Sequence, residues 1–151
     1  DVREQVQPVV VRGRRGDQVR RDRAAALVDQ RVERDGHPDQ ARLAGVLDAI
    51  VAMGADGLDP IEPPPQGDVL LRDVRSRYGR QLVLFGNLEI SDLETLPPDR
   101  FADVVRRALD EGTAGEGRGF VLMPSAAPYG RVLPERTRRN YEIMVELATG
   151  A

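Results

Sequence analysis

Apolar residues from residue 41 onward follow two spacings, one typical of amphipathic helices and one typical of buried strands. Spacings of three and four residues predict four helices, over 43–51, 70–78, 101–109 and 134–148. Short runs that are almost entirely apolar predict three strands between these helices, which are 57–61, 81–85 and 120–123. The predicted order is therefore helix, strand, helix, strand, helix, strand, helix.

Polar residues and prolines mark the expected helix starts. Asp68 is expected to cap the second helix and Asp99 the third, because a short acceptor side chain satisfies free backbone N–H groups there. Ser91 and Glu94 have the spacing of a capping box, which predicts a short helical turn before the third long helix. Pro134 is expected to begin the last helix, which would turn Tyr141, Met144, Val145 and Ala148 toward the protein.

Strands that are apolar on both faces and alternate with helices indicate an α/β fold, with a parallel sheet and helices packed outside it. Two architectures fit this order, a doubly wound sheet and part of a (β/α)8 barrel. A complete barrel needs about 250 residues. The chain has 151 residues, which corresponds to about half of a barrel.

Residues 1–40 differ from the rest of the chain. They hold nine of the 22 arginines and six of the 15 aspartates, with Val9–Arg12 as a candidate strand and Asp22–Arg34 as a candidate helix. A mixture rich in Arg, Gly, Val and Asp without Lys is typical of a GC-rich gene, and also of such a gene read in the wrong frame. We therefore divide the chain into an atypical segment, 1–40, whose origin as native coding sequence is open, and a barrel-like part, 41–151.

Composition excludes several kinds of chemistry. The chain has no Cys, no Lys and one His, which excludes zinc–thiolate sites, cysteine nucleophiles, Schiff-base lysines and multi-histidine metal sites. We expect no metal and no cofactor. The net charge of -3 gives no general attraction to nucleic acid or to an anionic membrane. No apolar run reaches the roughly 20 residues of a membrane span, and none resembles a signal peptide, so the expected compartment is the cytoplasm.

Polar residues follow each predicted strand, at the edge of the sheet where ligands bind in both architectures. In chain order these candidates are Asp59, Glu62, Asn87, Glu89, Ser125, Tyr129 and Arg131. Asp59 or Glu62 is expected to move protons, and Arg131 to bind a carboxylate of a small substrate. Asn87 and Ser125 are expected to orient the substrate, with Glu89 and Tyr129 as further substrate-binding residues. Each candidate also has a plainer alternative, as a turn residue, a loop-packing side chain or a solvated charge.

Three segments carry a family resemblance, with the sequences Met-Gly-Ala-Asp-Gly-Leu at 53–58, Leu-Phe-Gly-Asn-Leu-Glu at 84–89 and Gly-Phe-Val-Leu-Met-Pro at 119–124. With Pro134-Glu135 and Asn140-Tyr141 after them, they resemble in order and spacing the C-terminal part of the uroporphyrinogen decarboxylase superfamily. That superfamily also contains methylcobalamin:coenzyme M methyltransferases. The resemblance implies a (β/α)8 barrel and a cofactor-free lyase of porphyrin biosynthesis that acts on a carboxylate-bearing substrate.

The turn after the last predicted strand departs from the family pattern. Decarboxylases carry Gly-His-Gly there and zinc-dependent methyltransferases carry a Cys, whereas this chain has Ser125-Ala126-Ala127. Alanine can neither donate a proton nor bind zinc, so the resemblance implies a divergent decarboxylase-like enzyme, of which this chain is a fragment that is inactive alone. The alternatives are a methyltransferase-like relative without zinc and a non-catalytic barrel remnant that binds a small acid.

The unpaired strands of a half-barrel predict one further property. Open sheet edges present free N–H and C=O groups to other chains. We therefore expect a homodimer or another form of self-association through these edges.

Overall fold

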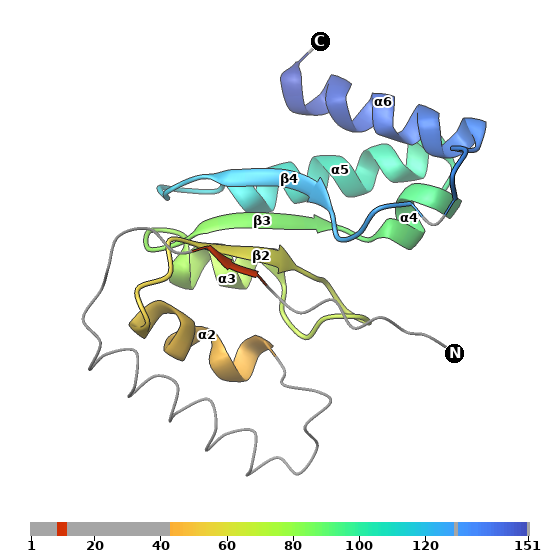
Figure 1. The fold of residues 1–151 in the computed structure, drawn as a ribbon. Coiled ribbons are helices and arrows are strands. Elements are labelled where there is room, and N and C mark those ends of the chain that lie inside the picture. Colours follow the sequence, from red (N-terminus) through yellow and green to blue (C-terminus); the bar gives the residue numbers. More distant parts are fainter. Residues whose placement is uncertain (1–8, 12–42, 129, 151) are drawn as a thin grey trace.

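The structure is a computed structural model that describes residues 9–11, 43–128 and 130–150 (Figure 1). Its centre is a four-stranded sheet in which the strands lie in chain order. The second, third and fourth strands are parallel, and the first is antiparallel to the second. The strands are β1 (Val9–Val11), β2 (Gly57–Ile61), β3 (Val83–Leu88) and β4 (Phe120–Pro124).

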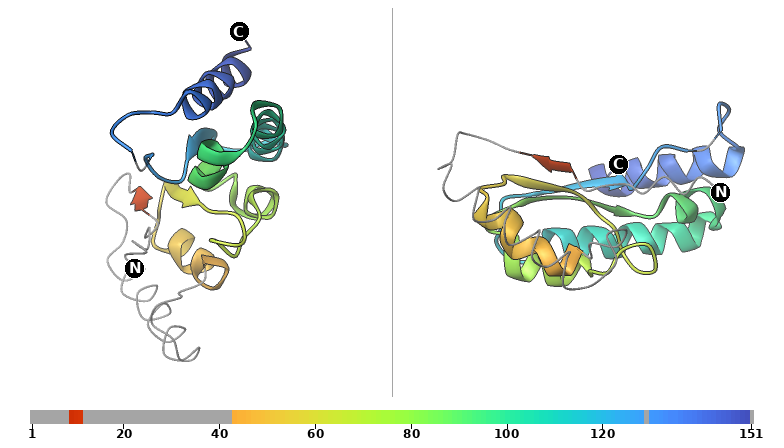
Figure 2. Two further views of the ribbon diagram at one scale, coloured as in Figure 1. Left: turned by 90° about the vertical axis from the view of Figure 1, so that its right-hand side faces the viewer. Right: turned by 60° about the horizontal axis from the view of Figure 1, so that its bottom comes forward.

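Helices connect the parallel strands, so the predicted α/β order is confirmed. They are α2 (Leu43–Ala52), α3 (Leu71–Tyr78), α4 (Ile90–Thr95), α5 (Pro98–Thr113) and α6 (Glu135–Thr149). Helices α2, α3 and α5 lie on one face of the sheet (Figure 2), and α6 packs against α4 and α5. A three-stranded parallel sheet with flanking helices is compatible with part of an α/β barrel.

The helix-covered face of the sheet holds the apolar core. Leu58, Leu84 and Leu88 are fully buried on this face, and Leu58 is the register partner of Leu84. Because side chains alternate along a strand, Phe85 and Asn87 point to the opposite face, which carries none of the helices α2, α3 and α5. The sheet therefore has one apolar, covered face and one mixed face.

The predicted strand Val9–Arg12 is confirmed as β1 over Val9–Val11. The predicted helix Asp22–Arg34 lies outside the described residues. Within residues 9–11, 43–128 and 130–150, no helix has the length and apolar character that a membrane crossing requires.

The predicted helix caps are wrong. Helix α3 begins only at Leu71, and both carboxylate oxygens of Asp68 instead accept hydrogen bonds from the backbone N–H of Ala44, at 3.3 and 3.4 Å. Asp99 lies inside the first turn of α5, whose N-cap is Pro97. Ser91 likewise lies inside α4, because that helix already begins at Ile90.

The predicted face of α6 is confirmed in part. Tyr141 and Met144 are partly buried against the apolar cluster of α4 and α5, whereas Val145 is 54% exposed. The most buried residues of the helix are Thr137, Asn140 and Ile143. Asn140 lies on the buried face because its side-chain amide donates hydrogen bonds to the carbonyl oxygens of Leu93, at 2.9 Å, and Leu96, at 3.0 Å. These carbonyls at the end of α4 are tertiary partners that local periodicity does not reveal.

Candidate functional site

The parallel strands end at one edge of the sheet, where the arrowheads of β2, β3 and β4 point in the same direction (Figure 1). The next residue after each strand is polar. Glu62 follows β2, Glu89 follows β3 and Ser125 follows β4. Three of the predicted site residues therefore lie together at the edge where α/β folds bind ligands.

Ser125 connects the ends of the three strands. Its hydroxyl hydrogen-bonds to the side chain of Glu62 and accepts a hydrogen bond from the backbone N–H of Ile90, at 3.4 Å. Its own backbone N–H donates to the carbonyl oxygen of Leu88, at 2.8 Å. Because Ser125 is only 8% exposed, these contacts hold its hydroxyl in place. We therefore interpret Ser125 as a residue that positions Glu62.

Glu89 is the most unusual group of the site. Its side chain is only 6% exposed, and its Oε1 atom has no hydrogen-bond partner among the described residues. Burial, together with the nearby negative charges of Glu62 and Asp92, raises the pKa of Glu89 to about 7. Near neutral pH this carboxyl is therefore present in both its protonated and its charged form.

Glu62 is half-buried next to Glu89. Burial raises the pKa of Glu62, while the hydrogen bond with Ser125 acts in the opposite direction by favouring the charged form. Glu89 has no such hydrogen bond at Oε1. This difference in environment favours Glu62 as the charged member of the pair and Glu89 as the protonated one.

Asp92 is a site residue that the sequence interpretation missed. It lies in the first turn of α4, three residues after Glu89, and its charge is one of the causes of the raised pKa of Glu89. Burial also raises the pKa of Asp92 itself. The signal in the sequence was the spacing of Glu89 and Asp92, because residues three apart at the start of a helix are neighbours.

Asp59 and Asn87 lie within strands, which corrects their predicted place in the loops after them. Asp59 is inside β2, where it is the register partner of Val9, and its peptide bond to Pro60 is cis. Strand β3 continues through Asn87, whose register partner is Met123. The strand passes Gly86 at a φ of 137°, a conformation that favours glycine. The Gly86–Asn87 peptide bond is also cis.

The other two candidates are not part of this cluster as far as it is described. Tyr129 lies outside the described residues. Arg131 is exposed in the segment before α6, and no ion pair joins it to another described residue. Among residues 9–11, 43–128 and 130–150, no three His, Cys, Asp or Glu side chains lie close enough together to hold a metal ion.

The cluster can exchange a proton with a bound molecule. A carboxyl group with a pKa near 7 serves equally well as a general acid and as a general base at neutral pH. The charged Glu62 beside it attracts cations and hydrogen-bond donors, and repels an anionic group placed close to it. The site therefore suits a ligand that presents a neutral or donor group to Glu62 and a proton-accepting atom to Glu89.

No family model matches this chain, and no curated protein and no solved structure matches it. The resemblance to the uroporphyrinogen decarboxylase superfamily accordingly remains a prediction from the sequence segments.

Proposed function

We propose that this chain is part of a (β/α)8-barrel enzyme of the uroporphyrinogen decarboxylase type, a lyase that acts on a small carboxylate-bearing substrate. The observation that carries the proposal is the buried carboxyl of Glu89, which holds a proton near neutral pH at the carboxyl edge of a parallel sheet. The three parallel strands with outer helices support it, because barrel enzymes place their chemistry at this edge. We propose the cytoplasm as the compartment.

Decarboxylation needs the proton that Glu89 can supply. The bond between the substrate carbon and its carboxylate breaks, CO2 leaves, and the electron pair stays on the carbon. The carboxyl of Glu89 then donates a proton to that carbon and regains one from water. No cofactor is required where the substrate itself delocalises the electron pair.

In this proposal, Ser125 and Glu62 control the protonation of Glu89. The hydrogen bond from Ser125 favours the charged form of Glu62, and a negative charge on Glu62 in turn raises the pKa of Glu89. The predicted proton role therefore moves from Asp59 to Glu89, while Glu62 keeps part of it. Arg131 remains the proposed partner of a substrate carboxylate, because it is exposed and has no ion-pair partner among the described residues.

The chain supplies three parallel strands, whereas a closed barrel has eight. We therefore also propose that turnover requires the remaining strands of the barrel. The isolated chain would then bind a ligand without converting it. Binding by the isolated chain is the property that can be tested directly.

The experiment is a calorimetric titration of the 151-residue chain with a porphyrin that bears carboxylate side chains and with succinate, at pH 6 and pH 8. We expect tighter binding of a carboxylate at pH 6, because a protonated Glu89 does not repel it. Glu89→Gln should remove this pH difference. Glu116→Gln is the control, because Glu116 is an exposed glutamate whose carboxylate pairs with Arg80 at 3.1 Å, away from the site.

Absence of carboxylate binding at either pH would contradict the proposal, and so would an unchanged pH difference in Glu89→Gln. The alternatives have their own outcome in the same assay. If the chain completed with its missing strands binds the ligand and releases no CO2, the protein is a small-acid-binding barrel instead of a lyase.

A further inference from the structure

Helix α4 positions two of the carboxyl groups at the site, although it has only six residues. Glu89 is its N-cap residue, and Asp92 lies in its first turn. A helix this short is not stable by itself, because the entropy lost in forming its first turn outweighs the few hydrogen bonds gained. The positions of Glu89 and Asp92 therefore depend on the contacts that hold α4 in place.

The C-terminal end of α4 lacks the backbone donors that would continue it. Pro97 and Pro98 follow its C-cap residue, Leu96, and proline has no N–H group. The carbonyl of Leu93 would pair with the N–H of residue 97 in a continuing helix, so it needs another donor. The side-chain amide of Asn140 in α6 supplies it, with hydrogen bonds to the carbonyl oxygens of Leu93, at 2.9 Å, and Leu96, at 3.0 Å.

Two chains of hydrogen bonds lead from Asn140 to the site. The N–H of Leu93 donates to the carbonyl oxygen of Glu89, at 3.1 Å, and the N–H of Leu96 donates to that of Asp92, at 3.0 Å. Asn140 thus holds the carbonyl groups of the same two residues whose N–H groups bind Glu89 and Asp92. Consecutive bonds of this kind strengthen one another.

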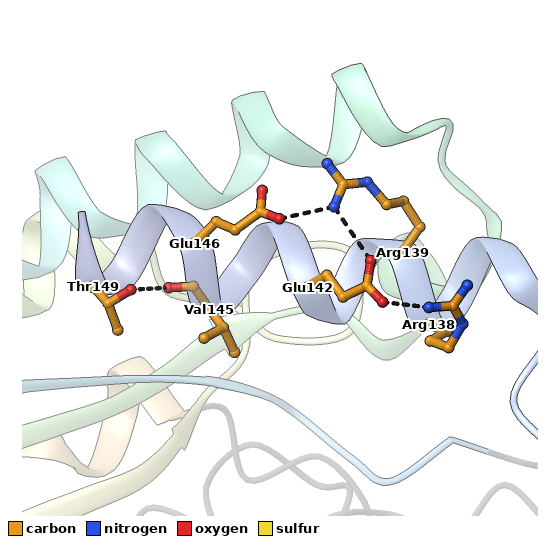
Figure 3. A network of polar contacts seen from close by, with 6 residues as sticks. All are labelled: Arg138, Arg139, Glu142, Val145, Glu146 and Thr149. Atoms are coloured by element: carbon orange, nitrogen blue, oxygen red, sulfur yellow. Dashed lines mark hydrogen bonds and ion pairs between the residues drawn. The ribbon is translucent and has the colours of Figure 1, made fainter. Parts of the chain in front are cut away.

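A second donor of α6 reaches the same end of α4. Arg136, one turn before Asn140, donates from Nη1 to the carbonyl oxygen of Thr95, at 3.0 Å. Arg139, in contrast, pairs with two glutamates of its own helix (Figure 3). Arg136 is exposed, so it holds α4 from the surface while Asn140 holds it from the interior.

Asn140 differs from the other buried polar residue of α6. Thr137 and Asn140 are both fully buried, at 0% exposure, and lie three residues apart on one face of the helix. The hydroxyl of Thr137 has no hydrogen-bond partner among the described residues, whereas the amide nitrogen of Asn140 has two. The two residues therefore share burial and differ in their bonds to α4.

We propose that Asn140, together with Arg136, is a positioning residue of the site. It fixes the C-terminal end of α4 and thereby keeps Glu89 and Asp92 beside Glu62 at the carboxyl edge of the sheet. This inference rests on the proposed function, since it concerns the placement of the proton donor Glu89. Helix α6 thus shapes the site from the far end of α4.

The experiment is carbon-detected NMR titration of the Glu89 carboxyl in the 151-residue chain and in Asn140→Leu. Leucine keeps the branched shape of the side chain and removes both donors. We expect the pKa of Glu89 to shift from about 7 toward 4.5, because a displaced α4 exposes its side chain and moves it away from Glu62. Thr137→Val is the matched control, since it removes an equally buried polar group without breaking a printed contact to α4, and it should leave the titration unchanged.

A second control separates positioning from a general loss of stability. Ile143→Ala removes a buried apolar side chain of α6 from its cluster with α4 and α5 and should also destabilise the protein. It keeps both donors of Asn140, so Glu89 should titrate as in the wild type. An equal shift in Ile143→Ala and Asn140→Leu would overturn the proposal.

Arg136→Met provides the test if Asn140→Leu does not fold, because Arg136 is exposed. We expect a smaller shift of the Glu89 pKa in the same direction. Arg139→Met is its control, since Arg139 pairs within α6, and it should cause no shift.

The outcomes distinguish this inference from the proposed function. If Glu89 of the wild-type chain titrates near 4.5, both fail. If the wild type titrates near 7 and the folded Asn140→Leu variant does the same, the role of Asn140 is refuted while the proposed function stands. Where Arg136→Met is the test, an unchanged titration in that variant refutes it likewise.

Discussion

Leu88 and Glu89 are neighbours in the chain and are both buried, yet their surroundings differ completely. Leu88 is fully buried under α5, in an apolar cluster with Phe101 and Val105. Glu89, at 6% exposure, is buried with one carboxyl oxygen unpaired and with two other carboxylates nearby. Burial therefore has different effects on the helix-covered face of the sheet and at its carboxyl edge.

On the covered face, burial stabilises the fold, because apolar groups lose contact with water. At the carboxyl edge, burial destabilises the charged form of a carboxyl and so keeps a proton on it. A buried, unpaired polar atom costs free energy, and such sites commonly serve a function. The comparison teaches that burial stabilises the fold on the covered face and shifts the pKa of a carboxyl at the edge.

The largest effect is expected on the covered face. Phe101→Ala should lower the free energy of unfolding by about 3–5 kcal/mol, because it removes a fully buried ring and leaves a cavity. Urea unfolding followed by circular dichroism measures the change. Val121→Ala is the control, since Val121 is 41% exposed, and it should change the same quantity by less than about 0.5 kcal/mol. Equal effects of the two variants would refute the division of the sheet into two faces.

The next largest effect is expected at Glu89, and it depends on pH. The folded-state pKa of Glu89 is raised from 4.5 to about 7, so between these values the folded protein binds more protons than the unfolded chain. Stability is then fully present below about pH 4.5 and decreases as the pH rises through 7.

Glu89→Gln should remove this pH dependence and should stabilise the protein at pH 8 by about 2 kcal/mol, after allowance for screening by solvent. Chemical unfolding at several pH values between 5 and 8 measures it, with Glu116→Gln as the control that retains the wild-type slope. A Glu89→Gln variant with the wild-type slope would show that another group carries the proton.

The comparison of the two regions also explains what the sequence could predict. The elements of the covered face follow from periodicity, since the helical spacing of Phe101 and Val105 reports burial directly. The apolar run of β3 predicts the strand but not its faces, because Val83 and Phe85 are only partly buried. The helix caps could not be predicted from local sequence in the same way. Asp68 has the right residue type for a cap, but its carboxylate contacts Ala44, which is distant in sequence.

The sequence could predict which residues gather at the site, but it could not predict the raised pKa of Glu89. Glu62, Glu89 and Ser125 come together because three parallel strands end at the same edge, which the order of elements already implied. Asn87 was misplaced because β3 ends at Leu88, three residues beyond the predicted strand 81–85. Asp59 lies inside β2, whose end at Ile61 agrees with the predicted strand 57–61. The raised pKa of Glu89 depends on tertiary burial, which no local pattern encodes.

The smallest effect is expected at Ser125, and it distinguishes the two carboxyls of Glu62 and Glu89 at the edge of the sheet. Ser125→Ala removes the hydrogen bond to Glu62 and leaves the backbone N–H of Ile90 without its acceptor, so we expect a loss of about 1 kcal/mol of stability. The pKa of Glu62 should rise further, because its charged form loses a donor. The pKa of Glu89 should then fall, since a neutral Glu62 no longer repels its charge.

Carbon-detected NMR titration of the glutamate carboxyls measures both shifts, and Ser125→Thr should preserve the wild-type values because it keeps the hydroxyl. If the two carboxyls titrate unchanged in Ser125→Ala, Ser125 only packs between the strand ends, and the charged state of Glu62 has another cause.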